Sequence, residues 1–382
     1  MSVPLEVARD RMIERAVSSR TVLGRGLPHW ASGETGEWTL TRDGDWTGGS
    51  YVGALWLAHI HDPVAVPWQL PWRASLLMQP RVKHRTAFKG FGFYFGAAAP
   101  HALVKNPGTT TLALDAARVL LDMFNERLGL IPLGEDAEEA AWIGTAESSI
   151  DSAQASALLY WAGGYTGEEA FDKVADQHLT RVLEIHAHDD GSVIQSSTLD
   201  PNAGHILRTH THKGYSDTSI WARAQAWAML YSAHAAVVRP SNPRWSEVAR
   251  RTLDWWIAHV PTDLISYWDF DDPTIPDTER DTAATAMAVA SALRLDHALG
   301  ESDGAPYRAF AERTASALVD RYVPPTGQDD ERPVGMLTGG CFTRRSTVRT
   351  QDTATNVELV FGSYFLLESL MILTGEIPAG RI

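Results

Sequence analysis

Four aspartates recur in similar tetrads along the chain, and each could supply a carboxylate for acid–base chemistry. The tetrads are Ile150-Asp-Ser-Ala153, Ser216-Asp-Thr-Ser219, Arg280-Asp-Thr-Ala283 and Gln351-Asp-Thr-Ala354. Their aspartates are 66, 64 and 71 residues apart, and each precedes an apolar stretch of helical periodicity. Asp followed by Ser or Thr also suits a helix start, where side-chain oxygens accept hydrogen bonds from free backbone N–H groups. We therefore interpret most of the four as helix N-caps.

Histidines and glycines in the loops are the other residues that could do chemistry. His205, His210 and His212 are close in sequence, but no Cys or Glu accompanies them at the spacing of a zinc site. The run Lys89-Gly-Phe-Gly-Phe93 lacks the Lys-Ser/Thr that completes a phosphate-binding loop. A Gly-x-Ser-x-Gly nucleophile motif is also absent from the sequence. We expect neither a metal nor a cofactor.

The acidic composition limits the partners. The 382 residues include 33 Lys and Arg against 47 Asp and Glu, a formal net charge of −14. Nucleic acid requires a concentrated basic surface, so we expect no nucleic-acid partner. The same charge repels an anionic substrate unless basic residues gather in the site. The 14 tryptophans suit sugar rings at a pocket mouth, although Trp is also an ordinary core residue.

Helices must position these residues, because apolar side chains recur at helical spacing and strand patterns are scarce. Buried helices are expected from near Gly48, from near His84 and after each tetrad. Amphipathic partner helices are expected at 68–79, 110–126, 168–187, 244–260 and 304–322. Six buried helices with amphipathic partners between them predict an all-α fold, an (α/α)6 toroid of six inner and six outer helices. No linker rich in Pro, Gly and Ser divides the chain, so we expect one domain over residues 1–382.

The N-terminal segment, the apolar runs and the cysteine count bear on location. Residues 1–17 are charged and amphipathic and do not resemble a signal peptide. No run of 18 apolar residues is present, so we expect no membrane span. Cys341 is the single cysteine, so no internal disulfide can form. Together these features favour a cytoplasmic protein, and they leave the oligomeric state open.

Several segments resemble the unsaturated glucuronyl hydrolase family, glycoside hydrolase family 88. They are Trp46-Thr-Gly-Gly49, Ile150-Asp-Ser152, Leu158-Leu-Tyr-Trp-Ala162, Lys213-Gly-Tyr-Ser-Asp-Thr-Ser-Ile-Trp-Ala-Arg-Ala-Gln-Ala-Trp227, Tyr267-Trp-Asp-Phe-Asp271, Arg280-Asp281 and Gly362-Ser-Tyr-Phe-Leu-Leu-Glu368. The resemblance covers nearly the whole chain from about Trp46 onward. Its stretch from Lys213 to Trp227 is highly specific, and the resemblance implies the same toroidal fold.

The resemblance implies an unusual glycosidase reaction. The substrate is a sugar chain that ends in a 4,5-unsaturated uronic acid, and the enzyme hydrates the C4=C5 enol ether. A carboxylic acid protonates C4, water adds at C5, and the resulting hemiketal opens with loss of the aglycone. Such a reaction needs one well-placed acid/base instead of the flanking carboxylate pair of ordinary glycosidases. The expected partner is therefore a small-molecule or oligosaccharide substrate with an acidic sugar.

Four family positions are retained in this sequence. The resemblance places the acid/base aspartate at Asp151. It places the arginine of the Trp-Ala-Arg segment at Arg223, the tryptophan that ends that segment at Trp227, and an aromatic of the first pocket loop at Trp46. A guanidinium matches a substrate carboxylate, which favours a clamp for Arg223, although an ion pair with a protein carboxylate is the alternative.

Three pocket segments depart from the family. Its His-Asp-Leu-Gly-Phe stretch begins with Lys89 and Gly90 here, so that glycine replaces the aspartate and lysine the histidine. Gln195 replaces a pocket histidine, and Lys213 replaces the glutamine that opens a Gln-Gly-Tyr motif. Gly90 is expected to open space beside the sugar ring, and the two lysines suit an anionic group on the substrate. We expect all four residues to lie at the substrate.

Two alternative functions stay open because the altered positions are those that contact the sugar. One is a different reaction on a sugar acid or specialised metabolite with the same scaffold. The other is a toroid that binds sugar without catalysis. The ultraviolet absorbance of an unsaturated uronide disappears on hydration, so its loss or its persistence despite binding distinguishes these functions.

Overall fold

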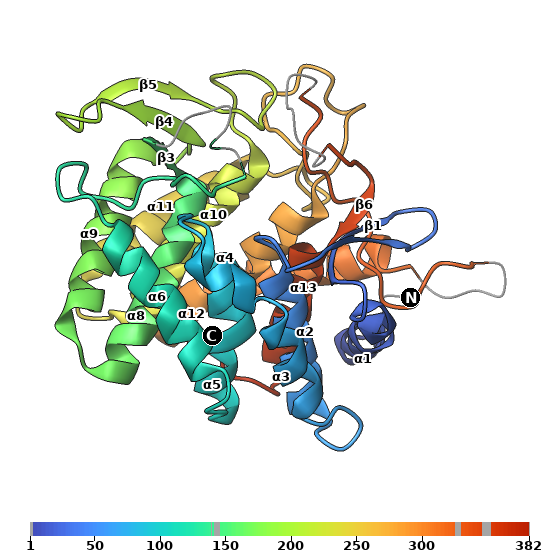
Figure 1. Cartoon of the computed structure of the whole chain (residues 1–382). Coiled ribbons are helices and arrows are strands. Elements are labelled where there is room, and N and C mark those ends of the chain that lie inside the picture. Colours follow the sequence, from blue (N-terminus) through green and yellow to red (C-terminus); the bar gives the residue numbers. More distant parts are fainter. Residues whose placement is uncertain (1–2, 139, 141–145, 325–329, 346–352, 382) are drawn as a thin grey trace.

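The computed structural model of the chain describes residues 3–138, 140, 146–324, 330–345 and 353–381, most of them in helices (Figure 1). The α-helices are α1 (Leu5–Ser18), α2 (Gly48–His61), α3 (Gln69–Leu76), α4 (Lys89–Phe93), α5 (Ala99–Val104), α6 (Thr110–Met123), α8 (Ala155–Thr166), α9 (Glu169–His186), α10 (Ala222–Val238), α11 (Pro243–His259), α12 (Thr282–Tyr322) and α13 (Val360–Leu373). Short helical turns are η1 (Ser19–Val22), η2 (Gln79–Lys83), η3 (Tyr94–Ala98), η4 (Ile150–Gln154) and η5 (Ala379–Arg381).

Some of these helices are buried on every side. All residues from Ala222 to Ala236 of α10 are buried, and α13 and the first part of α12 have the same character. Small alanine side chains on α10 let it pack closely against α8, α11 and α12. By contrast, α9 and α11 bury one face only. In the part of the chain that the structure describes, no helix combines the length and the apolarity that crossing a bilayer requires.

Neighbouring helices follow one another around the molecule, and the last one returns to the first. α13 packs against α12 and also against α2, and α1 contacts both α2 and α13. α12 leaves helical conformation at Gly300, which has φ 75° and ψ 174°, so its two parts are separate helices. This closed succession of buried and amphipathic helices fits an α/α toroid, as the repeat in the sequence predicts.

Periodicity predicts the amphipathic helices to within a few residues. The expected segments 168–187 and 244–260 are α9 and α11, and the expected segment 304–322 is the second part of α12. The expected segments 68–79 and 110–126 are α3 and α6, which are slightly shorter. The helix expected from near His84 begins later, at α4, because the backbone is extended at His84, directly after the turn η2. It continues through the π-helical turn η3 into α5.

The N-cap interpretation of the four tetrads is only partly correct. Asp281 caps α12, since its carboxylate accepts hydrogen bonds from the backbone N–H groups two and three residues ahead. Asp151 lies inside η4, whose N-cap is Ser149. Asp217 precedes the first residue of α10 by five positions, and it pairs with an arginine side chain instead of capping that helix. The interpretation is thus confirmed for Asp281 and wrong for Asp151 and Asp217, and Asp352 lies outside the described residues.

Two antiparallel sheets lie toward one end of the helices, at the top and right of Figure 1. Their strands are β1 (Leu27–Ser32), β2 (Trp38–Thr41), β3 (Glu147–Ser149), β4 (Ser196–Leu199), β5 (Ile206–His210) and β6 (Val357–Leu359), in the orders β2-β1-β6 and β3-β4-β5. β3 leads directly into η4, and the Ile150 backbone N–H donates to the Gln195 carbonyl oxygen over 2.9 Å. The second sheet therefore fixes the start of the segment that carries Asp151.

Candidate active site

Five of the residues that the sequence singles out line one pocket. The space between their side chains is about 320 Å³. The lining residues are Trp46, Phe88, Phe91, Glu138, Asp151, Lys213, Trp221, Arg223 and Trp227. A second pocket of about 340 Å³ is lined by Asp45, Trp46, Arg81, Thr86, Phe88, Lys89, Gly92, Phe93 and Glu138. We call the first the Asp151 pocket and the second the Lys89 pocket. The two adjoin, because they share two aromatic residues and one acidic residue.

Among the described residues, two side chains donate hydrogen bonds to the Asp151 carboxyl group. Ser149 Oγ donates to Asp151 Oδ2 over 2.6 Å, and Gln195 Nε2 donates to the same oxygen over 3.3 Å. Ser149 Oγ also accepts a hydrogen bond from the Asp151 backbone N–H at 3.3 Å. Donors on one carboxyl oxygen stabilise negative charge there and restrict rotation of the group. Asp151 is thus a half-buried carboxyl group in a set orientation, as an acid or base for proton transfer must be.

Gln195 is fixed by the residues that follow β5. Its Oε1 accepts hydrogen bonds from Thr211 Oγ1 at 2.7 Å, from the His212 backbone N–H at 3.2 Å and from the Lys213 backbone N–H at 3.1 Å. Three donors on this oxygen set the orientation of the amide, so that its nitrogen faces Asp151. The sequence predicts a substrate contact for Gln195, and the structure shows a support for the candidate acid/base.

Asp269 holds the loop that carries Lys213. Asp269 is fully buried, and its Oδ2 accepts hydrogen bonds from the Tyr215 backbone N–H at 2.8 Å and from Ser219 Oγ at 2.7 Å. Burial raises the pKa of the Asp269 carboxyl, although these donors oppose the shift. Two of the sequence segments that carry the family resemblance therefore meet at one aspartate, which positions the 213–219 loop over the pocket.

Lys213 and Trp46 lie next to each other in the Asp151 pocket. Lys213 Nζ is 6.0 Å from the centroid of the Trp46 ring, a distance at which an ammonium is attracted to an aromatic face. The Lys213 carbonyl oxygen accepts a hydrogen bond from Thr343 Oγ1 at 2.7 Å. Lys213 is 4% exposed, so it is no solvated surface lysine. It places positive charge inside the pocket of a chain whose net charge is −14.

Arg223 forms a buried ion pair at the edge of the pocket. Its guanidinium donates to the Asp281 carboxylate and to the carbonyl oxygens of Cys341 and Phe342. The guanidinium carbon also lies 4.5 Å from the centroid of the Trp221 ring. The structural ion pair, which was the alternative to a substrate clamp, is therefore confirmed. Arg223 lines the Asp151 pocket in this paired state, and a contact with substrate stays a prediction.

Aromatic rings pack closely around the Asp151 pocket. The Trp227 ring centroid is 4.6 Å from that of Phe91 and 5.9 Å from that of Tyr231. Phe91 in turn lies 5.3 Å from the Trp46 ring. Trp227 is 1% exposed, so most of its surface packs against protein. These rings give the site an apolar wall that suits the faces of a sugar ring.

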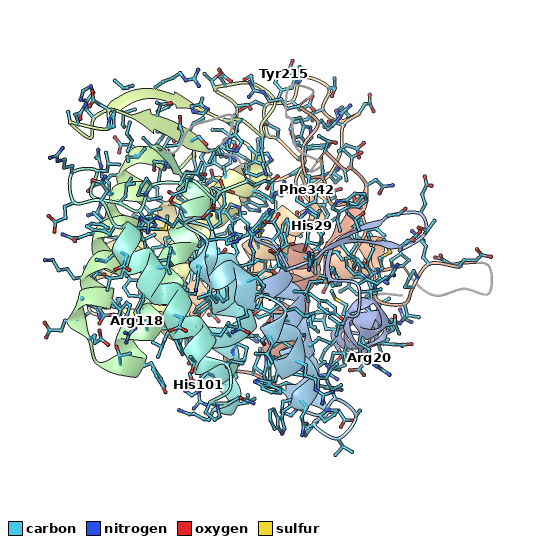
Figure 2. All side chains as sticks on the ribbon, viewed as in Figure 1. Arg20, His29, His101, Arg118, Tyr215 and Phe342 are labelled. Atoms are coloured by element: carbon cyan, nitrogen blue, oxygen red, sulfur yellow. The ribbon has the colours of Figure 1, made fainter. Side chains whose placement is uncertain are left out.

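His29 on β1 supports the loop that carries Trp46. His29 Nδ1 lies 2.7 Å from Thr47 Oγ1, and the His29 ring centroid is 5.3 Å from that of Phe342. Figure 2 shows His29 and Phe342 close together near the middle of the molecule, with Tyr215 at the upper edge. The sheet β2-β1-β6 thereby joins the Trp46 loop to the segment that accepts hydrogen bonds from Arg223.

Lys89 lies in the adjoining pocket instead of beside Asp151. Its Nζ donates to the carbonyl oxygens of Arg81 at 3.0 Å and Val82 at 2.7 Å. Burial, and after it the nearby Arg81 charge, lower the pKa of Lys89 to about 7. The sequence predicts a substrate contact for this lysine, and the structure places it one pocket away from the candidate acid/base.

Gly90 does not open space beside the pocket as expected. A Cβ atom added to Gly90 would lie 1.9 Å from Gln154 Oε1 and 2.3 Å from the Gln154 carbonyl oxygen. The glycine therefore packs against η4, the segment that also carries Asp151. The expectation of open space is wrong because α4 turns this position toward η4, and the sequence alone does not reveal which face of so short a helix meets the pocket.

Glu138, Phe88 and Trp221 also line the Asp151 pocket and were not singled out from the sequence. Trp221 stands in the fifteen-residue segment that carries the resemblance, next to the residues that were named. Glu138 offers no such signal, because it follows Glu135 and Asp136 in an acidic run that reads as a solvated surface. It brings a second carboxylate into both pockets.

The three histidines of the 205–212 segment do not converge on one point. His205 is exposed, and His210 Nε2 lies 3.3 Å from Glu147 Oε2. His212 faces Gln195 instead, and its ring centroid is 6.5 Å from that of His210. Among the described residues, no group of three or more potential ligands is arranged to hold a metal ion.

Comparison with known sequences identifies relatives along most of the chain. An unsaturated glucuronyl hydrolase of Bacillus sp. strain GL1 is 30% identical over 360 residues, which cover 91% of this chain and 91% of that protein. An unsaturated chondroitin disaccharide hydrolase of Streptococcus agalactiae serotype III is 25% identical over 340 residues, 86% of this chain and 81% of that protein. No protein-family model matches the chain.

Solved structures agree with these sequence relatives. The unsaturated glucuronyl hydrolase of Bacillus sp. GL1, described as responsible for the degradation of glycosaminoglycan, aligns with a TM-score of 0.84 at 25% identity over 97% of both chains. A complex described as UGL with dGlcA-Glc-Rha-Glc aligns with a TM-score of 0.86 at 25% identity over 97% of both chains. Both alignments extend over nearly the whole of this chain.

Proposed function

The chain belongs to the unsaturated glucuronyl hydrolase family, and from this premise we propose how its Asp151 pocket acts on substrate. The enzyme is a hydrolase that removes an unsaturated uronosyl residue by hydrating its C4=C5 enol ether. One observation carries the assignment to this pocket: Asp151, Lys213 and Trp46 line the same space of about 320 Å³. A proton donor, a cation and an aromatic face are the groups that an unsaturated acidic sugar ring requires.

Asp151 is the acid/base of this proposal. Its carboxyl group protonates C4, positive charge develops at C5 and the ring oxygen, and water adds at C5 while giving a proton back to Asp151. The hemiketal opens and the aglycone departs, so one water is consumed and Asp151 is regenerated. Ser149 and Gln195 donate to Oδ2, and these hydrogen bonds orient the carboxyl group for the proton transfer.

Substrate binding is shared between a cation and aromatic rings. Lys213 holds the carboxylate of the unsaturated sugar, since a compact ammonium suits an anion and is buried here. Trp46 and Trp227 contact the apolar face of the ring. Arg223 orients the pocket wall and adds positive charge near the carboxylate. Lys89 contacts groups of the substrate that extend into the adjoining pocket.

The two alternative functions have less support. A toroid that only bound sugar would have no use for a carboxyl group oriented by two donors, which Asp151 retains. A different reaction on a sugar acid or specialised metabolite would need the same scaffold with a new acceptor or nucleophile. Besides Asp151, the described lining of the pocket holds one further carboxylate, that of Glu138. The combination of acid, cation and aromatic face around Asp151 favours the family reaction, which is the one we propose.

The order and the contacts of the helices support a toroid of six helix pairs. Five successive pairs are α2 with α3, α4–α5 with α6, α8 with α9, α10 with α11, and the two parts of α12. α13 and α1 form the sixth pair in this proposal, because they contact each other and α2. We propose six inner and six outer helices in one domain over 1–382. The cytoplasmic location and the absence of nucleic-acid and membrane partners stay predictions.

Ultraviolet absorbance tests the proposed function. The protein is incubated with unsaturated disaccharides that differ in linkage and sulfation, and the absorbance of the enol ether is followed. We expect loss of absorbance with at least one of them. Persistent absorbance with every disaccharide, together with binding measured by calorimetry, would instead support a sugar-binding protein.

A further inference from the structure

The Gln195 side chain connects Asp151 to a histidine that does not line the Asp151 pocket. Gln195 Nε2 is 3.3 Å from Asp151 Oδ2 and 3.2 Å from His212 Nε2. An amide nitrogen has two N–H groups and no acceptor, so it donates one to each partner. The orientation cannot be reversed cheaply, because three donors already hold the amide oxygen.

These hydrogen bonds determine which ring nitrogen of His212 carries the proton. Since Gln195 donates to His212 Nε2, that nitrogen carries no proton and the ring is neutral with its proton on Nδ1. His212 Nδ1 then donates to Ser196 Oγ, which lies 3.0 Å away. Ser196 is the first residue of β4 and is buried. The imidazole is thus held at one nitrogen by the sheet and presents the other nitrogen as an acceptor to Gln195.

We infer that His212 is a positioning residue for the hydration reaction, which acts on Asp151 through Gln195. The three donors fix the Gln195 amide oxygen, and His212 Nε2 together with Asp151 Oδ2 fixes the amide nitrogen. Without the His212 acceptor, the nitrogen can shift about the fixed oxygen, and its hydrogen bond to Asp151 Oδ2 lengthens or is lost. This inference rests on the proposed function of Asp151, and it gives a role to a histidine whose sequence context suggests only a metal ligand.

Two substitutions separate this role from ordinary packing. Glutamine can place its amide oxygen near the position of His212 Nε2, and asparagine can place its amide group near the position of Nδ1. His212→Gln therefore keeps the acceptor for Gln195 and gives up the bond to Ser196. His212→Asn keeps a partner for Ser196 and gives up the acceptor for Gln195. Both variants are neutral and polar, so a merely structural role predicts no preference for glutamine.

The experiment measures kcat and KM on an unsaturated disaccharide that the wild-type protein hydrates. We expect His212→Asn to lower kcat about fivefold or more, the worth of one hydrogen bond, with KM little changed. We expect His212→Gln to stay within about twofold of wild type. In a Gln195→Met background the His212→Asn substitution should add no further loss, because its effect passes through Gln195.

His188→Asn is the matched control. His188 Nδ1 contacts Ser192 Oγ at 2.9 Å, a bond of the same kind as that between His212 and Ser196, and kcat should not change. Equal kcat values for His212→Gln and His212→Asn, or fully additive losses with Gln195→Met, would overturn the inference. If His212→Asn does not fold, Gln195→Met alone tests the link, and an unchanged kcat in that variant would also overturn it. Absence of turnover by the wild-type protein would remove the proposed function itself.

Discussion

Gln195 and Asp151 are 44 residues apart in sequence, and the Gln195 amide nitrogen donates to Asp151 Oδ2 over 3.3 Å. β3 and β4 bring them together, because Asp151 lies two residues after β3, Gln195 directly precedes β4, and the two strands pair. The family has a histidine at the position of Gln195, and a neutral amide replaces a titratable ring there. The candidate acid/base is therefore supported in this chain by a group that carries no charge at any pH.

Lys213 is expected to bind the carboxylate of the substrate. Lys213→Met removes a charge-assisted hydrogen bond worth about 1.5–3 kcal/mol, so KM should rise about tenfold or more while kcat changes less. Steady-state kinetics on one unsaturated disaccharide measure both constants. Lys213→Arg is the control, since it keeps the charge, and it should lie between wild type and Lys213→Met. An unchanged KM in Lys213→Met would show that the anion binds elsewhere.

Gly90 is expected to tolerate no side chain. Gly90→Asp restores the residue type of the family, yet its Cβ would meet the backbone of Gln154 at 2.3 Å. Forced overpacking of this kind costs about 1–3 kcal/mol, so the melting temperature should fall by several degrees. Gly92→Ala in the same helix is the control, because its Cβ would meet only Met78 Sδ at 4.0 Å. Thermal melts of the two variants compare them, and equal melting temperatures would contradict the packing of α4 on η4.

His178 is expected to make stability depend on pH. Its Nδ1 accepts from the Ile131 backbone N–H at 3.1 Å, its Nε2 donates to the Ser152 carbonyl oxygen at 2.9 Å, and burial lowers its pKa from 6.5 to about 4. Between these values the unfolded chain binds a proton that the folded chain does not, so stability falls as the pH drops from 6.5 to about 4. His178→Gln keeps an acceptor and a donor but does not titrate. Its melting temperature should depend less on pH in this window than that of wild type, and parallel curves would disprove the assignment.

Lys89 is expected to make stability depend on pH between about pH 10 and pH 7. Burial lowers its pKa from 10.5 to about 7, so the unfolded chain gains a proton before the folded chain does as the pH falls through this range. The contribution of Lys89 to stability therefore decreases from about pH 10 to pH 7, by up to about 1.4 kcal/mol per pH unit. Lys89→Met has no titrating group at this position. The melting temperature of Lys89→Met relative to wild type should rise as the pH is lowered, and a constant difference would contradict a depressed pKa.

The helices could be predicted because their signal is repetitive. Apolar periodicity places α9 and α11 almost at their observed bounds, since each has one buried face. The tetrads were less informative, because Asp followed by Ser or Thr satisfies several local geometries. Asp281 caps a helix, whereas Asp217, which is also followed by Thr, pairs with an arginine from a distant loop.

The site could be predicted where a residue keeps its family neighbours. Trp46, Asp151 and Lys213 meet in one pocket as the resemblance implies. Arg223 shows what sequence cannot supply, because its partners Asp281 and Cys341 lie 58 and 118 residues away along the chain. The direction of a side chain on a helix as short as α4 also depends on its packing, which composition and spacing do not encode.

Asp151 is the proposed acid/base of the hydration reaction, and the substitution Asp151→Asn tests this role most directly. Asparagine keeps an oxygen that can accept from Ser149 and Gln195, so the circular dichroism spectrum and melting temperature should match those of wild type. It cannot transfer a proton to C4, so the rate of absorbance loss from an unsaturated disaccharide should fall by about 10²–10⁴-fold, the usual contribution of a general acid/base. A folded Asp151→Asn protein that hydrates the disaccharide at nearly the wild-type rate would contradict the assignment of Asp151 as the acid/base.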